Sequence, residues 1–240
     1  INTCGNGQHS STSTDGVHWS SPVALSSGNW NYNDTIAVGA DVVVYRTYNY
    51  IDDMGVINWG KDPNDSLNEI LPAGIGRVVH DGNGTEQEID WNGVVYQGGY
   101  FIAYGSYYES SVVTSPSINI PYWIYSQDGI NWTKGNVNLS HLETIIDTEI
   151  GINNSVTGLE ISGVVYNGTG WLFTTWWYGA DPSENPGGFY ITDITGTLNN
   201  SSYSSDIPYA WYTTIWTGNK WILSAQDWED GVYYTNTNTN

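Results

Sequence analysis

Hydrophobic positions along this chain form short runs, and these runs predict β-strands. The runs are rich in Val, Ile, Tyr, Trp and Thr, and Gly, Asn and Asp separate them. Spacing typical of an amphipathic helix is almost absent. The predicted strands come in groups of three: 35–38, 42–48 and 55–59; 93–97, 100–105 and 121–126; 163–166, 171–177 and 188–192; and 213–217, 221–226 and 231–236. The pattern therefore predicts an all-β protein built from one repeated unit.

A short phrase marks the turn between the first two strands of each group. It consists of a small or aromatic residue, Gly two positions later, and an apolar residue three further on. Its copies begin at residues 37, 96, 166 and 216, with gaps of 59, 70 and 50 residues, and the two chain ends together supply a further 61. Repeats that use the whole chain in this way are typical of a closed ring. We therefore expect a single domain, 1–240, folded as a four-bladed β-propeller whose last blade is completed by residues 1–36, with five blades as the alternative.

Two predicted tight turns share the sequence Ser-x-Asp-Gly-x-x-Trp, at Ser126–Trp132 and Ser13–Trp19. Asp-Gly favours a hairpin turn with positive φ, and the Trp can fold back over it. These turns resemble the Asp-box of BNR-type β-propellers, although Gly here follows Asp directly. The resemblance implies a fold and no activity, because propellers host many functions. Resemblance to a sialidase would require three arginines around the substrate carboxylate, and the chain has two, Arg46 and Arg77.

The charge of the chain excludes several partners. Five basic residues stand against 25 acidic ones, which gives a net charge of −20. So acidic a chain lacks a phosphate-binding footprint, and we expect neither nucleic acid nor an anionic membrane surface as a partner. No apolar run is long enough to insert into a membrane as a helix. Cys4 stands alone, which excludes an intrachain disulfide, and the start at Ile1 favours a processed mature chain.

Asn-x-Ser/Thr sequences are more frequent than chance predicts. This modest excess favours an extracellular or cell-surface glycoprotein, although an Asn- and Thr-rich surface also produces such sequences by accident. Nine such sequences occur, one of them at Asn131. The candidate glycosylation sites are the other eight: Asn33, Asn64, Asn83, Asn138, Asn153, Asn167, Asn199 and Asn200.

Two acidic residues occupy matching places in neighbouring repeats. Asp90 begins Asp-Trp-Asn-Gly-Val-Val-Tyr, and Glu160 begins Glu-Ile-Ser-Gly-Val-Val-Tyr. Both precede an innermost strand, where the mouth of a propeller channel is expected. A glycoside hydrolase needs two such carboxyls, one protonated and one ionised. Among 25 acids one coincidence is also expected by chance, so we predict ordinary acids without catalytic activity, and a glycoside hydrolase as an alternative.

Aromatic residues recur beyond the second strand of each group. Flat rings beside Asn and Asp side chains suit the stacking of a sugar ring, whereas packing between blades is the competing interpretation. The candidate glycan-stacking residues are Tyr48, Tyr107, Tyr108, Trp176, Trp177 and Trp228.

Metal-binding patterns are weak in this sequence. Oxygen donors alternate along Asp62–Glu69 and again at Asp81, Asn83 and Thr85, but the glycine and terminal acid of a calcium loop are missing. The four histidines show no ligand spacing. We expect no cofactor, with Ca²⁺ as the alternative.

The chain ends supply one strand more than four closed blades need. Residues 8–19 resemble a third strand, a turn and a fourth strand, yet Gly231–Asn236 already resembles a third strand of the last blade. An extra edge strand explains this surplus, and so does exchange of a terminal strand with another copy of the protein. On this basis we predict a non-catalytic, self-assembling structural subunit of an extracellular fibre, surface layer or virion appendage. The alternatives are a glycan-binding, lectin-like module and the glycoside hydrolase with Asp90 and Glu160.

Overall fold

The computed structural model describes the parts of the chain in which the predicted strands lie. These are residues 9–11, 13, 17–21, 23–24, 35–49, 54–61, 68–69, 78–80, 86–109, 118–138, 159–177, 187–199, 201–204, 211–225 and 232–234. Within these ranges the chain forms β-strands and turns and no helix. The predicted all-β class is confirmed.

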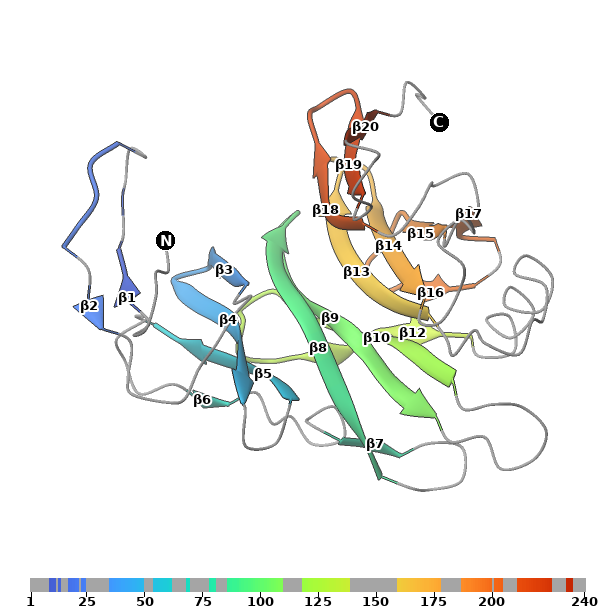
Figure 1. Ribbon diagram of the computed structural model, residues 1–240, viewed down its shortest axis with the longest axis horizontal. Coiled ribbons are helices and arrows are strands. Elements are labelled where there is room, and N and C mark those ends of the chain that lie inside the picture. Colours follow the sequence, from blue (N-terminus) through green and yellow to red (C-terminus); the bar gives the residue numbers. More distant parts are fainter. Residues whose placement is uncertain are drawn as a thin grey trace.

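Four antiparallel sheets follow one another along the chain (Figure 1). The first contains β3 (Ile36–Gly39), β4 (Val42–Asn49), β5 (Met54–Gly60) and β6 (Asn68–Glu69). The second contains β7 (Val78–His80), β8 (Glu86–Gln97), β9 (Tyr100–Glu109), β10 (Ile118–Ser126) and β11 (Thr133–Lys134). The third contains β13 (Leu159–Tyr166), β14 (Trp171–Trp177), β15 (Gly188–Ile191) and β17 (Tyr203–Ser204). The fourth contains β18 (Trp211–Trp216), β19 (Trp221–Ala225) and β20 (Val232–Tyr234). The four predicted groups of three strands are therefore confirmed.

The repeated phrase forms the tight turns between β3 and β4, β8 and β9, β13 and β14, and β18 and β19. Gly98, Gly168 and Gly218 have φ values of 54°, 97° and 96°, the left-handed region that glycine adopts without strain. In the first sheet Ala40 and Asp41 take the positive φ instead, at 46° and 60°. A side chain at Gly39 would collide with the ring of Tyr96, so a close approach explains the glycine there.

Three strands, β8, β13 and β18, each contain a β-bulge. The register shifts between Trp91 and Gly93 in β8, between Ile161 and Gly163 in β13, and between Trp211 and Thr213 in β18. Residues 86–91, which we expected to precede the strand predicted at 93–97, are the first half of β8. Asp90 and Glu160 therefore lie within strands, just before the bulges, rather than ahead of the strands.

Neighbouring sheets are joined by packing and by hydrogen bonds. The rings of Trp123 and Phe173, one from each of two sheets, lie 5.3 Å apart and are fully buried. Three polar contacts join the innermost strands: Val94 N donates to Thr35 Oγ1 at 2.8 Å, Asn92 Nδ2 to the Ile161 carbonyl at 3.0 Å, and Tyr166 N to Gln97 Oε1 at 2.6 Å. A short parallel pair of β12 (Asn136–Val137) with β16 (Thr197–Leu198) adds a further link.

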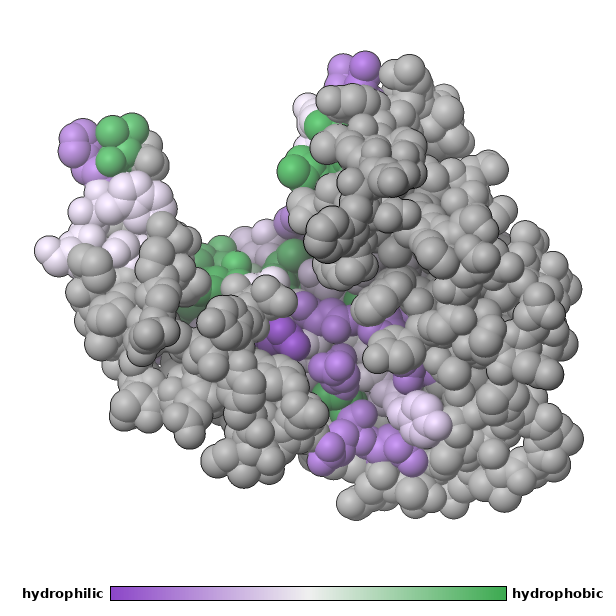
Figure 2. Space-filling model, in the orientation of Figure 1, coloured by the Kyte–Doolittle hydropathy of each residue, from purple (hydrophilic) through white to green (hydrophobic). Residues whose placement is uncertain are grey.

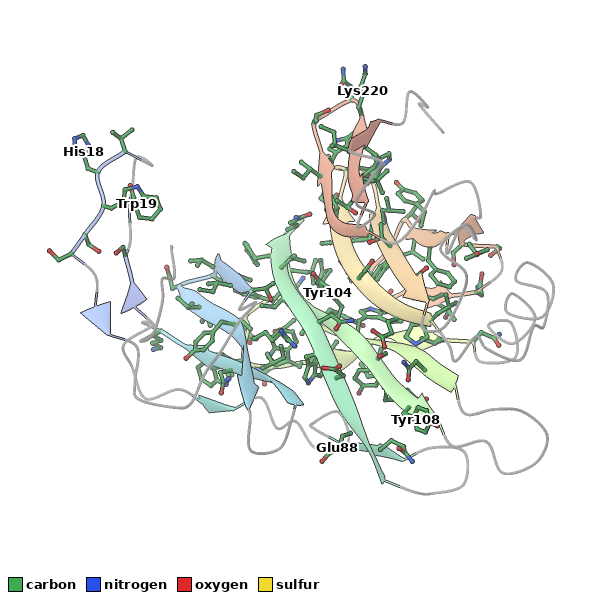
Figure 3. The ribbon with its side chains drawn as sticks, viewed as in Figure 1. His18, Trp19, Glu88, Tyr104, Tyr108 and Lys220 are labelled. Carbon is green, nitrogen blue, oxygen red and sulfur yellow. The ribbon has the colours of Figure 1, made fainter. Side chains whose placement is uncertain are left out.

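Among the described residues, the predicted closure of the last blade by both termini is not found. β1 (His9–Ser10) pairs with β2 (Val23–Ala24) as a separate two-stranded sheet, and among the described residues the sheet of β18–β20 has three strands. Figure 1 shows β1 and β2 at the left of the molecule, apart from β18–β20 at the top, with the other sheets linking the two groups in an arc below. Trp19, predicted to pack beside Trp216 and Trp221, is on the β1–β2 side (Figure 3). The two predicted partners do contact each other, with ring centroids 4.7 Å apart.

Candidate active site

Glu160 is a buried carboxyl held by polar side chains of the preceding sheet. It is the second residue of β13, and only 8% of it is exposed. Asn119 Nδ2 from β10 donates to Glu160 Oε1 at 2.7 Å. Asn92 from β8 and Ser106 from β9 also hydrogen-bond to the carboxyl. Glu160 thus has a defined position between two sheets.

Asp90 is an exposed carboxylate close to this buried one. It lies in β8, opposite Ser106 in the register with β9, and 63% of its side chain is exposed. Arg46 Nη2 lies 4.0 Å from Asp90 Oδ1 and belongs to a buried side chain of β4. The backbone N–H of Arg46 donates to the Thr35 carbonyl at 3.0 Å, which holds this part of β4 in place. Three sheets therefore supply the guanidinium and the two carboxyls.

The surroundings of Glu160 favour its protonated form. Burial raises the pKa of Glu160 above its ordinary value, and the negative charge of Asp90 raises it further. The hydrogen bonds from Asn92, Ser106 and Asn119 oppose this shift without cancelling it. A buried carboxyl with a raised pKa beside an exposed carboxylate is the arrangement of a general acid with an ionised partner.

Sequence reasoning found the two carboxyls but missed the residues around them, which are Arg46, Asn92, Ser106 and Asn119. A signal existed for Arg46, because it interrupts the apolar run Val42–Tyr45 that leads into it. Asn92 follows Asp90 by two residues on the same strand, the spacing of one face. No local signal connects Ser106 or Asn119 with Glu160.

Polar residues gather on the face of the molecule around this region. Figure 2 shows hydrophilic residues over the part of this face occupied by β8 and β9. In Figure 3, Glu88 and Tyr108 lie near the same ends of these strands, where β8 begins and β9 ends. This face therefore offers hydrogen-bonding groups to a polar ligand.

The aromatic candidates do not all lie in comparable surroundings. Tyr107 is only 8% exposed and packs edge-on against Tyr122, with centroids 5.9 Å apart, so little of its ring is open to a ligand. Tyr108 is 47% exposed. Strands β4 and β14 contain Tyr48, Trp176 and Trp177, whose side chains lie outside the described part of the structure, as does Trp228 altogether. Glycan stacking stays a prediction.

The candidate glycosylation sites are only partly described. Asn33, Asn64, Asn83, Asn153 and Asn200 lie outside the described residues. Asn138 donates its backbone N–H to the Leu198 carbonyl, and the side chains of Asn167 and Asn199 accept hydrogen bonds within their own turns. Their occupancy stays a prediction.

Metal and membrane sites receive no support from the described ranges. The two candidate calcium segments lie almost entirely outside them. Within the ranges, no group of three or more His, Cys, Asp or Glu side chains could hold a metal ion. A helix long and apolar enough to cross a membrane is likewise not found in this part of the chain.

The Asp128 turn follows the end of β10 and lies beside the start of β9, at the end of these strands opposite to Tyr108. Asp128 Oδ1 accepts hydrogen bonds from Ser126 Oγ and from the backbone N–H groups of Ile130 and Asn131, at 2.7–2.9 Å. The Trp132 indole N–H donates to the Gly129 carbonyl at 3.0 Å, and Gly129 has a φ of 72°. The hydrogen bonds from Asn131 hold the pKa of Asp128 well below its usual range. The predicted turn geometry, with the Trp folded back over the turn, is thus confirmed at Ser126–Trp132. Asp15 and Gly16 of the second turn lie outside the described residues.

No protein-family model and no curated protein matches the sequence. Three solved structures similar to this chain are named as enzymes or enzyme families that act on glycosides. A GH32 β-fructofuranosidase from Bombyx mori, a mutant in complex with sucrose, aligns with a TM-score of 0.41 and 12% identity over 85% of this chain and 45% of its own. A second structure comes from the GH130 family of mannoside phosphorylases, which contains glycoside hydrolases that target β-1,2-mannosidic linkages in Candida mannan. It aligns with a TM-score of 0.36 and 10% identity over 80% of this chain and 58% of its own. A glycosyl hydrolase from Bacteroides ovatus aligns with a TM-score of 0.39 and 13% identity over 85% of this chain and 62% of its own. This chain thus spans about half of the length of these proteins.

The carboxyl pair overturns the prediction of two ordinary acids in a non-catalytic structural subunit. The two acids at matching positions are not unrelated solvated side chains, because Glu160 is buried and the negative charge of Asp90 raises the pKa of Glu160. We therefore correct both the predicted structural function and the predicted absence of catalysis.

Proposed function

We propose that this protein cleaves glycosidic bonds, with Glu160 as the general acid and Asp90 as its ionised partner. The carrying observation is the raised pKa of Glu160, caused by burial and by the charge of Asp90. A protonated carboxyl can donate its proton to the glycosidic oxygen as the bond to the sugar breaks. The exposed Asp90 carboxylate, beside the Arg46 guanidinium, can face the sugar or an attacking water from solvent. Asn92, Ser106 and Asn119 orient the acid.

The test compares the whole protein with three variants on a panel of aryl glycosides and neutral oligosaccharides. We expect Glu160→Gln and Asp90→Asn to lower kcat/KM by about 10²–10⁴-fold, the usual contribution of a positioned acid or base. Glu88→Gln is the matched control, because Glu88 is an exposed acid on the same strand as Asp90. Failure of the wild type to hydrolyse any substrate, or full activity of both active-site variants, would contradict the proposal.

Substrates with different leaving groups distinguish a general acid at Glu160 from a residue with a purely structural role. A dinitrophenyl group departs without protonation, whereas an alkyl or sugar leaving group needs a proton. Glu160→Gln should therefore retain far more activity on a dinitrophenyl glycoside than on an oligosaccharide. Equal losses on both substrates would contradict proton donation. Because Glu160 acts protonated and its pKa is raised, the wild-type rate should fall as pH rises through that pKa.

A glycan-binding module without turnover is the second candidate. The exposed ring of Tyr108 favours it. Binding of an oligosaccharide to the wild type without any hydrolysis would select this function.

We also propose that the sheets are the blades of a propeller and that the chain forms one domain. Four sheets carry the repeated phrase, and the β1–β2 pair is a fifth antiparallel sheet within the described ranges, which supports the five-bladed alternative. An extracellular, glycosylated protein remains our proposal from the Asn-x-Ser/Thr sequences. Association with further copies through a terminal strand remains a prediction from the surplus strand.

A further inference from the structure

A second concave site lies away from the carboxyl pair, beside the Asp128 turn. It is a cavity of about 420 Å³ lined by Tyr100, Tyr125, Ser126, Gln127, Asp128, Asn131 and Thr133. Tyr100 begins β9, and Ser106, which binds Glu160, lies six residues further along this strand. At a rise of about 3.3 Å per residue, about 20 Å separate the two sites. The cavity is therefore distinct from the candidate active site.

Two tyrosines form the apolar part of this cavity and are held in place by packing. The rings of Tyr100 and Tyr125 meet edge to face, with centroids 6.2 Å apart and an interplanar angle of 73°. Trp171, from the next sheet, packs edge-on against Tyr100 at 6.3 Å. Gln127 Nε2 donates to the Tyr100 hydroxyl at 3.1 Å. A ring fixed in this way loses little conformational freedom when a ligand stacks on it.

The polar part of the cavity is equally preorganised. Asp128 Oδ2 accepts the Asn131 side-chain amide at 2.7 Å, and a carboxylate oxygen can accept a second hydrogen bond. The low pKa of Asp128 keeps it an acceptor in acidic solution as well. Gln127 and Thr133 add exposed amide and hydroxyl groups. Apolar ring faces beside several hydroxyl-binding groups match the alternating C–H and O–H surface of a sugar.

Charge restricts the class of sugar. Asp128 contributes a carboxylate, and Asp193 lies close enough that its charge adds to burial in raising the pKa of Tyr125. Two negative charges beside the cavity repel uronic and sialic acids. We propose that this cavity is a second carbohydrate-binding site, remote from the carboxyl pair, that takes a neutral oligosaccharide.

Binding is tested on the Glu160→Gln protein, so that hydrolysis does not consume the ligand. The probes are cello-, manno-, xylo- and fructo-oligosaccharides, with oligogalacturonate as the anionic comparison. The measurements are calorimetry and the NMR signals of the Gln127 and Asn131 side-chain amides. We expect one neutral probe to bind and to shift both signals, and Gln127→Ala to weaken this binding about five- to tenfold, the effect of one lost hydrogen bond.

Lys220→Ala is the matched control, since Lys220 is exposed in the β18–β19 turn outside the cavity, and it should leave binding unchanged. The proposal is overturned if no neutral probe shifts the two amides, if oligogalacturonate binds more tightly, or if Gln127→Ala leaves affinity unchanged. Because the readout is binding, the result does not depend on whether the wild type hydrolyses glycosides.

Discussion

At the scale of single residues, the environment of Glu160 works against its ionisation. Burial and the nearby Asp90 both disfavour the charged form, while three side-chain hydrogen bonds partly compensate. A group whose pKa is raised in the folded protein contributes stability below its unfolded pKa. This contribution is lost as pH rises through the folded value. An ionised Glu160 at neutral pH is thus a cost to the fold that a neutral side chain of the same shape avoids.

We therefore expect Glu160→Gln to be catalytically impaired yet at least as stable as the wild type. The difference in the free energy of unfolding should be small near about pH 4 and should grow in favour of the variant towards about pH 7. Thermal melts at both pH values check this. Glu88→Gln, at an exposed position, should show no such trend. A variant that is less stable than the wild type at neutral pH would identify the carboxylate as a structural group.

At the scale of elements, one glycine determines how closely β8 and β9 approach beside the site. A side chain at Gly105 would collide with the backbone carbonyl of Asp90. Gly168, in the β13–β14 turn, has a φ of 97°, and a side-chain carbon at this position would meet nothing within 4 Å. The first glycine is thus needed for space and the second for backbone conformation.

Gly105→Ala should push the strands apart at Asp90, lowering the free energy of unfolding by about 2–3 kcal/mol and lowering kcat/KM as well. Gly168→Ala should cost about 1–2 kcal/mol through its left-handed conformation and leave kcat/KM unchanged. Denaturant unfolding and kinetics of both variants check the comparison. An equal effect of the two changes on kcat/KM would show that the strand approach does not position Asp90.

At the scale of the whole molecule, the large negative net charge affects the stability of the fold. The sheets follow one another in an arc (Figure 1), and a net charge of −20 is spread over a single chain of 240 residues. Repulsion among these charges destabilises the compact state, and salt screens it, since the Debye length falls from about 30 Å at 0.01 M to about 8 Å at 0.15 M.

We accordingly expect the Tm to rise by about 2–4 °C, or about 1 kcal/mol, between 10 mM and 150 mM NaCl. Differential scanning calorimetry measures the shift, and sucrose of equal osmolality serves as the uncharged control. A Tm that does not change with salt, or that changes equally with sucrose, would show that long-range repulsion has no net effect on this fold.

The sequence alone determined the local structure. Short apolar runs and the repeated glycine phrase predicted the hairpins, because strand formation and tight turns depend on residues close together in the chain. The Ser126–Trp132 turn was predictable for the same reason, since its hydrogen bonds join residues two or three positions apart. The matching repeats also identified Asp90 and Glu160 as equivalent positions.

Only the tertiary structure decided the surroundings of these acids and the pairing of the strands near the N-terminus. Asn119 and Glu160 are 41 residues apart in the chain, and they meet only because two sheets pack together. Burial sets the pKa of Glu160, and burial depends on side chains from several strands that no local pattern reveals. The separate pairing of β1 with β2 likewise followed from long-range contacts, whereas the repeat arithmetic predicted a ring closed with β18–β20. Sequence periodicity specifies strands and turns, but the partners of a side chain across sheets depend on how the whole chain packs.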